Sequence, residues 1–350
     1  MRAILKRRTG PGVELAEVRA PAPGPGEALL RVLVAGICGT DLHIVDWSPW
    51  AAGRVHPPRV IGHEMAGRVV AVGPGVERPR VGELVGVETH LVDGVCRQCR
   101  RGNYHVCEAT RILGVDVDGT LAEAVVVPAR NCWPTPEALG PEVTAFQEPM
   151  GNAVHAALQG PLHDRTVLVT GSGPIGCAAV GVARAEGAAR VVAVDRTRER
   201  LTMARAMGAD AVVDTGPLAP PDLTGALAEA LGGEADVVLE MAGAPDLLLA
   251  GLAVLAPGGW LSLLGLGNTA ATLDLDRLVV MRGVTVFGVT GRRQFDTWVR
   301  TTGYLESGAV DVRPLLTHRF PIDRFAEALA VARSGRGGKV LIYPGDGPHP

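Results

Sequence analysis

The chain has 350 residues, 47% of them hydrophobic, and a formal net charge of −3, which allows two domains with large cores and gives no sign of a nucleic-acid-binding tract. The first ten residues carry charges without an apolar segment behind them, and no apolar run reaches the roughly 18 residues of a membrane span. We therefore expect a soluble, cytoplasmic protein with no nucleic-acid or membrane partner. Lys6 and Lys339 lie near the chain ends, which argues against Schiff-base chemistry because that needs a buried lysine.

The first 150 residues are dominated by short strands. The runs at 28–35 (ALLRVLVA) and 68–72 (RVVAV) have the composition and rhythm of strands, and a Pro- and Gly-rich connector at 21–26 precedes them. Helical periodicity is scarce in this part of the chain. We predict a β-rich domain with an irregular, barrel-like sheet.

Three side-chain types that bind zinc follow the first of these runs. Cys38 opens the sequence Cys-Gly-Thr-Asp, and His63 and Glu64 come after a loop. A catalytic zinc takes three protein ligands and keeps one position open for water or substrate. A lone cysteine is often a small buried apolar residue, so this hypothesis rests on the combination. Thr40 and His43 lie beside the first ligand and are candidates to carry a proton away.

A second group of possible metal ligands follows in the run Asp93 to Cys107. Cys96 and Cys99 form a CxxC pair, and Cys107 is the third thiol. A structural zinc normally has four ligands, and a carboxylate such as that of Asp93 is an acceptable fourth. The alternative is a lobe that has lost its zinc and is held by packing alone.

The middle of the chain carries the pattern of a dinucleotide-binding loop. A β-branched run at 165–170 leads directly into Gly171, Gly173 and Gly176, spaced as G-x-G-x-x-G before a helix of small residues. Such glycines let the backbone approach a pyrophosphate at the helix N-terminus. About twenty residues on, a second strand ends in Asp195, which can bind ribose hydroxyls and repel a 2′-phosphate. NADP remains the alternative because arginines follow, but the acid comes first and favours NAD.

Strand and helix patterns continue to alternate up to residue 289, which predicts a doubly wound parallel sheet. The tail ends in a strand at 339–343 (KVLIY) and is expected to rejoin the first domain. We therefore predict an α/β protein with a zinc-binding catalytic domain at 1–150, completed by 290–350, and a dinucleotide-binding domain at 151–289.

These motifs, in this order, resemble those of the zinc-dependent medium-chain alcohol dehydrogenases, and the resemblance runs from end to end. Within that family the runs Gly102–Cys107, Glu148–His155 and Gly291–Trp298 are similar to those of L-threonine 3-dehydrogenases. The resemblance implies a GroES-like catalytic domain, a Rossmann domain that binds NAD, a catalytic zinc, a second structural zinc and a homotetramer.

The resemblance also implies roles for single residues. Glu148 matches an acid close to the catalytic zinc, which is either a displaceable ligand or a group that tunes the bound water. Thr40 and His43 match a proton relay, and His90 matches a histidine near the substrate pocket. The implied zinc ligands are Cys38, His63 and Glu64 at the catalytic site and Asp93, Cys96, Cys99 and Cys107 at the structural site. The implied NAD-binding residues are Gly171, Gly173, Ile175, Gly176, Asp195, Arg200, Leu264, Gly265, Leu266, Val289 and Thr290.

Three positions depart from the family pattern. Asp93 replaces a cysteine, Ala124 a tyrosine and Met150 a phenylalanine, and we expect Met150 to reshape the substrate pocket. The reaction implied is zinc-assisted oxidation of the secondary hydroxyl of L-threonine, a small amino alcohol, to 2-amino-3-oxobutanoate with hydride transfer to NAD. One alternative is another secondary alcohol, 2,3-diol or polyol. The other is a zinc-free NAD(P)-binding module, a regulator or an enoyl reductase, against which the intact metal triad argues.

Overall fold

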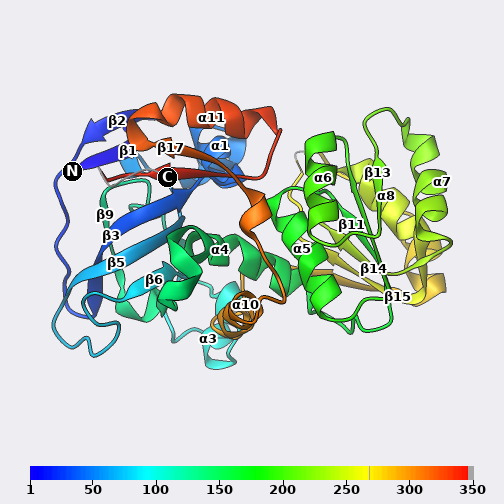
Figure 1. Ribbon diagram of the computed structural model, residues 1–350, viewed down its shortest axis with the longest axis horizontal. Helices are drawn as coiled ribbons and strands as arrows, with labels where there is room; N and C mark the ends of the chain where they lie inside the picture. The colour runs from blue at the N-terminus through cyan, green and yellow to red at the C-terminus, as the bar shows by residue number, and fades with distance from the viewer. Residues whose placement is uncertain (268, 346–350) are drawn as a thin grey trace.

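The structure, a computed structural model, describes residues 1–267 and 269–345 and places its two largest sheets on either side of a central pair of helices (Figure 1). One sheet has the order β10-β6-β5-β3-β18-β17, with β9 also paired to β3. Because β18 pairs antiparallel with β3, the end of the chain returns to the N-terminal sheet as predicted. The strands are β3 (Glu27–Gly36), β5 (Glu64–Val72), β6 (Leu84–Val87), β9 (Ala124–Pro128), β10 (Cys132–Pro134), β17 (Leu316–Pro321) and β18 (Lys339–Tyr343).

Alternation along β3 explains how this sheet buries its core. Ala28, Leu30, Val32 and Val34 are buried, whereas the residues between them are more exposed, as expected when successive side chains point to opposite faces. Helices and small strands complete this half of the molecule. They are α1 (Gly39–Asp46), α2 (Pro49–Arg54), α11 (Phe325–Ser334), β1 (Arg2–Lys6), β2 (Glu14–Glu17), β4 (Arg59–Val60), β7 (His90–Leu91) and β8 (Arg111–Ile112).

The second sheet is six-stranded and parallel, in the order β13-β12-β11-β14-β15-β16. In order of appearance its strands run 3-2-1-4-5-6, the arrangement typical of dinucleotide-binding folds. The predicted doubly wound sheet is therefore confirmed. Its elements are β11 (Thr166–Thr170), α5 (Pro174–Ala185), β12 (Arg190–Asp195), α6 (Arg198–Ala206), β13 (Ala211–Asp214), α7 (Pro220–Leu231), β14 (Ala235–Glu240), α8 (Pro245–Val254), β15 (Leu255–Leu263) and β16 (Thr285–Gly288).

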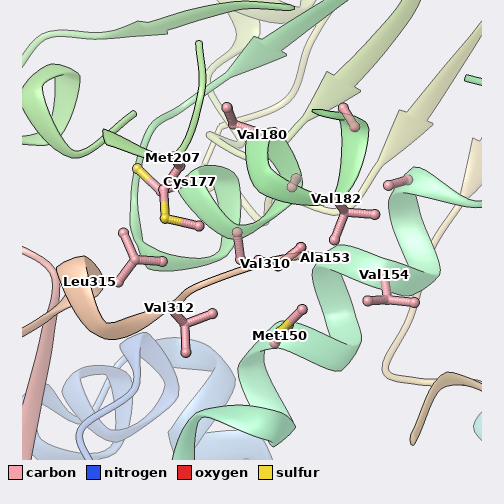
Figure 2. Close-up of a cluster of buried hydrophobic side chains, with 14 of the residues drawn as sticks. Met150, Ala153, Val154, Cys177, Val180, Val182, Met207, Val310, Val312 and Leu315 are labelled. Atoms are coloured by element: carbon pink, nitrogen blue, oxygen red, sulfur yellow. The ribbon is translucent and has the colours of Figure 1, made fainter. Parts of the chain in front are cut away.

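Helix α4 (Gly140–Ala157) joins the two halves. It packs against β5 on one side and α5 on the other, and Figure 2 shows Met150 of α4 within the apolar cluster that includes Cys177 of α5 and Val312. Met150 has no exposed surface, so the expectation that it shapes the substrate pocket is wrong.

Ala124 on β9 lines a cavity of about 630 Å³, and none of the described residues around that cavity is a predicted site residue.

The predicted domain boundary at residue 150 falls inside α4, and the division into 1–150 with 290–350 and 151–289 stays a prediction. Residues 346–350 of the expected tail lie outside the described residues.

Across 1–267 and 269–345, no helix combines the length and apolar character needed to cross a membrane. The other helices are α3 (Arg97–Arg100), α9 (Leu275–Leu278) and α10 (Asp296–Glu306), with 3-10 turns η1 (Tyr104–Val106), η2 (Ala129–Asn131), η3 (Glu137–Leu139), η4 (Val280–Arg282), η5 (Arg313–Leu315) and η6 (Ile322–Arg324).

Candidate metal centres and cofactor site

Cys38, His63 and Glu64 converge in the structure. One possible ligand atom from each lies within 4.8 Å of the others. Cys38 caps the start of α1 just after β3, and Glu64 begins β5. Because β3 and β5 pair antiparallel with Gly36 opposite Glu64, the sheet register brings together segments that are separated by a long loop.

This donor set fits a cation. Glu64 Oε2 is buried and has no hydrogen-bond partner among the described residues, an arrangement that is costly unless something else compensates it. His63 Nδ1 lies 3.9 Å from Asp41 Oδ1. Burial disfavours the charged form of His63, yet the nearby Cys38 sulfur and the Asp41 carboxylate raise the pKa of His63 to about 10. The site thus attracts positive charge strongly, as three zinc ligands should.

Lys339 is a further residue of this centre that the sequence interpretation missed. Its Nζ donates to Glu64 Oε1 at 2.6 Å and to the Ile37 carbonyl at 3.3 Å. Burial opposes the charged form, but Glu64 is the main group that raises the pKa of Lys339. The place of Lys339 near the end of the chain gives no sign of this contact, because it is the pairing of β18 with β3 that carries Lys339 into the core. Lys6 is buried as well, so a position near the end of the chain does not keep either lysine at the surface.

Thr40 and His43 lie on α1 next to this ligand set. The Thr40 hydroxyl is 3.9 Å from Cys38 Sγ. His43 follows three residues later, on the same side of the helix, is half-buried, and meets the Trp50 ring edge-on at a centroid distance of 6.3 Å. The role of the two side chains as a proton relay stays a prediction.

Glu148 lies on α4 and is buried, but it is not a member of the three-ligand set. Its Oε1 accepts hydrogen bonds from Thr89 Oγ1 at 3.2 Å and from Arg292. Arg292 also binds Glu88, and although burial disfavours that carboxylate, Arg292 lowers the pKa of Glu88 to about 2. The sequence interpretation identified neither Arg292 nor Glu88.

His90 lies on β7, beside this buried charge cluster. Its backbone N–H donates to Glu88 Oε1 at 2.9 Å, and its ring Nδ1 is 4.0 Å from the same oxygen. Burial first, and the positive charge of Arg292 second, lower the pKa of His90 to about 4. His90 is therefore neutral at pH 7 and is available as a hydrogen-bonding group rather than as a charge.

The four lobe residues also gather around one point. The possible ligand atoms of Asp93, Cys96, Cys99 and Cys107 all lie within 4.8 Å of one another, and the cysteines are free thiols. Backbone N–H groups face two of the sulfurs, with Cys99 N 3.4 Å from Cys96 Sγ and Ala109 N 3.4 Å from Cys107 Sγ. Three thiols and one carboxylate in this arrangement fit a closed, four-coordinate zinc site.

The carboxylate at this site leads to a testable difference in zinc retention. Asp93→Cys should slow zinc release from the lobe to a chelator by roughly tenfold, because thiolates bind zinc better than a solvent-exposed carboxylate does. Release is followed with a colorimetric chelator, and zinc at the catalytic site serves as the internal control. Equal or faster release from the lobe of the variant would contradict a ligand role for Asp93.

The glycine loop has the form needed to receive a pyrophosphate. Gly173 is the N-cap of α5, no side chain caps it, and a Cβ added there would meet nothing within 4 Å. At Gly176, by contrast, a Cβ would lie 1.8 Å from the Gly171 carbonyl oxygen, so only glycine permits this tight start of the helix. Free helix N–H groups with open space before them fit a phosphate.

Asp195 is buried at the end of β12, beside this loop. Its two oxygens accept hydrogen bonds from the backbone N–H groups of Ser172 and Thr197, each at 2.9 Å. Arg200 lies 3.8 Å away from one of them. The acid is thus held in a fixed position where the predicted ribose contact would be made.

Removal of the negative charge of Asp195 should change the preference of the enzyme for NAD over NADP. Asp195→Asn removes repulsion of a 2′-phosphate while an amide oxygen remains for hydrogen bonding, so the NAD to NADP ratio of kcat/KM should fall about tenfold, equivalent to ~1.4 kcal/mol. The ratio is measured by parallel initial rates. Asp214→Asn on the neighbouring strand β13 is the control, and a ratio that does not change in the Asp195 variant would count against the ribose contact.

The remaining predicted cofactor residues lie at or near the same edge of the sheet. Ile175 is half-buried in the first turn of α5. Val289 N donates to the Leu263 carbonyl at 2.9 Å and so continues the β15–β16 edge, and Leu266 is 92% exposed. Carboxyl ends of parallel strands meet at this edge, which is where ligands bind in such folds. The predicted set here is Leu264, Gly265, Leu266, Val289 and Thr290.

Two protein-family models match the chain. Residues 24–137 match the alcohol dehydrogenase GroES-like domain, and residues 174–304 match the zinc-binding dehydrogenase model. Among curated proteins, the chain is 45% identical over 343 residues to an L-threonine 3-dehydrogenase of Pyrococcus horikoshii, with 98% of both chains covered. It is 42% identical over 344 residues to that of Bacillus subtilis, covering 98% of this chain and 99% of the relative.

Two solved structures share the architecture of this chain at lower sequence identity. A protein described as a short chain alcohol dehydrogenase from Escherichia coli, complexed with NADH, superposes with a TM-score of 0.89 at 30% identity, and the match covers 98% of this chain and 99% of that one. A 2R,3R-butanediol dehydrogenase from Bacillus subtilis gives a TM-score of 0.87 at 27% identity and the same coverage.

Proposed function

The chain belongs to the zinc-dependent medium-chain alcohol dehydrogenase family, and from that premise we propose that it oxidises the secondary hydroxyl of L-threonine to 2-amino-3-oxobutanoate with NAD as hydride acceptor. The observation that carries this proposal is the convergence of Cys38, His63 and Glu64. The similarity to L-threonine 3-dehydrogenases, which covers 98% of the chain, supports the substrate.

Each group of side chains has a task in this reaction. Zinc held by Cys38, His63 and Glu64 would polarise the hydroxyl and lower its pKa, and NAD would take the hydride. In this proposal Thr40 accepts the hydroxyl proton, and His43, three residues further along α1, passes it to solvent. Glu148 adds a buried carboxylate on α4, the helix that packs against β5.

Reduction of NAD by the purified protein tests this function directly. L-threonine is compared with D-threonine, 2,3-butanediol and sorbitol, and the absorbance of NADH is followed. Fast reduction with L-threonine alone is expected. Turnover of the diol or of sorbitol without turnover of L-threonine would retain the metal chemistry and refute the substrate.

The proposal extends to the assembly and location of the protein. A homotetramer is supported by strand β16, whose outer edge pairs with no strand among the described residues, and by the exposed apolar side chains of Val286 on β16 and of Val280 and Met281 in the preceding turn η4. A cytoplasmic location is supported by six cysteines that are all free thiols, most of them in the two metal-ligand sets. Light scattering measures the number of subunits.

A further inference from the structure

Arg292 forms a buried link between Glu148 and a second carboxylate. It lies between β16 and α10 and is 1% exposed. Its Nε and Nη2 donate to the two oxygens of Glu88 at 2.9 and 2.6 Å, and Nη2 also reaches Thr89 Oγ1 at 2.8 Å. The remaining nitrogen, Nη1, donates to Glu148 Oε1. All three nitrogens of the guanidinium are therefore used, which fixes its orientation.

The surroundings hold Arg292 in place independently of Glu148. Trp298 Nε1 donates to Glu88 Oε2 at 2.7 Å, so the Glu88 carboxylate that binds the guanidinium is itself held in place. On α4, a Cβ added at Gly151 would lie 2.6 Å from Arg292 Cδ, so the absence of a side chain there leaves room for the arginine to pass. The arginine is thus held by other groups, and Glu148 is the partner that it can position.

Glu148 is tethered differently from Glu88. Both oxygens of Glu88 are bound by Arg292, whereas Glu148 is held through Oε1 alone, by Arg292 and Thr89. One guanidinium cannot neutralise two carboxylates, so a net negative charge stays buried. Helix α4, which carries Glu148, packs against β5, whose first residue is Glu64, yet Glu148 is not part of the converging ligand set.

The Glu148 carboxylate has a second possible partner, the cation of the Cys38–His63–Glu64 set. If Glu148 were released, it would be drawn to the cation in the neighbouring set and would occupy the position that a catalytic zinc keeps open for substrate. We propose that Arg292 is a positioning residue that, together with Thr89, holds Glu148 beside the Cys38–His63–Glu64 set but outside it. This inference rests on the proposed zinc chemistry and adds a residue to it.

The test compares two variants in which cobalt(II) replaces zinc. Glu88→Gln retains the tether of Glu148. The double variant Glu88→Gln with Arg292→Met removes one positive and one negative charge together, so that Glu148 loses its arginine while the net charge stays that of the parent protein, which is measured alongside. Entry of Glu148 into the metal site raises the coordination number, which weakens and shifts the visible absorption of cobalt.

We expect weaker cobalt bands in the double variant than in Glu88→Gln, slower metal loss to a chelator, and a fall in kcat of about 10- to 100-fold, the range found when outer partners of a metal site are lost. Addition of Glu148→Gln to the double variant should restore the cobalt spectrum, although not activity. A merely structural role for Arg292 would not be reversed by removal of Glu148.

Thr89→Val is a milder change that should preserve the fold. It removes the second tether of Glu148 and should shift the cobalt spectrum in the same direction by a smaller amount. Identical spectra and release rates in Glu88→Gln, the double variant and Thr89→Val would overturn the proposal, as would failure of the parent protein to bind cobalt at this site. The cobalt readout needs no substrate, so a wrong substrate assignment would appear separately, in the NAD reduction assay.

Discussion

Replacement of Cys38 by serine should release the catalytic zinc and abolish alcohol oxidation while leaving the fold intact. A hydroxyl is a much poorer zinc ligand than a thiolate, and His63 and Glu64 alone leave the site with two ligands. Loss of an outer partner typically costs about 10- to 100-fold in metal affinity or activity, so loss of a direct ligand should cost more. Metal content by atomic absorption and NAD reduction are the two measurements.

Cys132→Ser is the matched control for this variant. Cys132 is another free thiol, but unlike the half-buried Cys38 it packs in the apolar core of the N-terminal half, and it belongs to neither ligand set. The control should lose some stability and keep all of its zinc. Full zinc and full activity in Cys38→Ser would refute the assignment of Cys38 as a ligand.

Replacement of Lys339 by methionine should lower the stability of the metal-free protein by about 3–5 kcal/mol, the usual cost of removing one partner of a buried ion pair. Glu64 would keep a buried carboxylate whose Oε2 already lacks a partner and whose Oε1 would lose the 2.6 Å contact with Lys339. Added zinc should recover part of the loss, because it binds the folded state. Denaturant unfolding with and without zinc measures both effects.

Lys6 provides the matched control for Lys339, since it is also buried but pairs with the carbonyls of Gly10 and Gly12 and not with a carboxylate. Lys6→Met should cost less, about 1.5–3 kcal/mol for hydrogen bonds to a charged donor, and zinc should not offset that loss specifically. A second check is Lys339→Met with Glu64→Gln, which should recover stability. Equal stability of Lys339→Met and the parent protein would show that the ion pair contributes nothing.

Several features could be predicted from residue order because they depend on local chemistry. The glycines at 171, 173 and 176 follow a β-branched strand and precede a helix of small residues, and the structure places them at that junction. Cys96, Cys99 and Cys107 lie close together in the chain, so one short lobe can gather them with Asp93. The parallel sheet follows from strand and helix patterns that alternate.

Other features depend on pairings between distant segments, which local patterns do not encode. Met150 lies two residues from Glu148, yet a helix turns successive side chains to different faces, and Met150 points into the core. Lys339 reaches Glu64 only through the pairing of β18 with β3, and Arg292 reaches Glu148 across 144 residues. By itself the sequence determined which ligand types and which loop the protein carries, because these are set by side-chain chemistry and short spacings. Only the tertiary structure decided which charges surround them, because burial and long-range contacts arise when the sheets and α4 pack together.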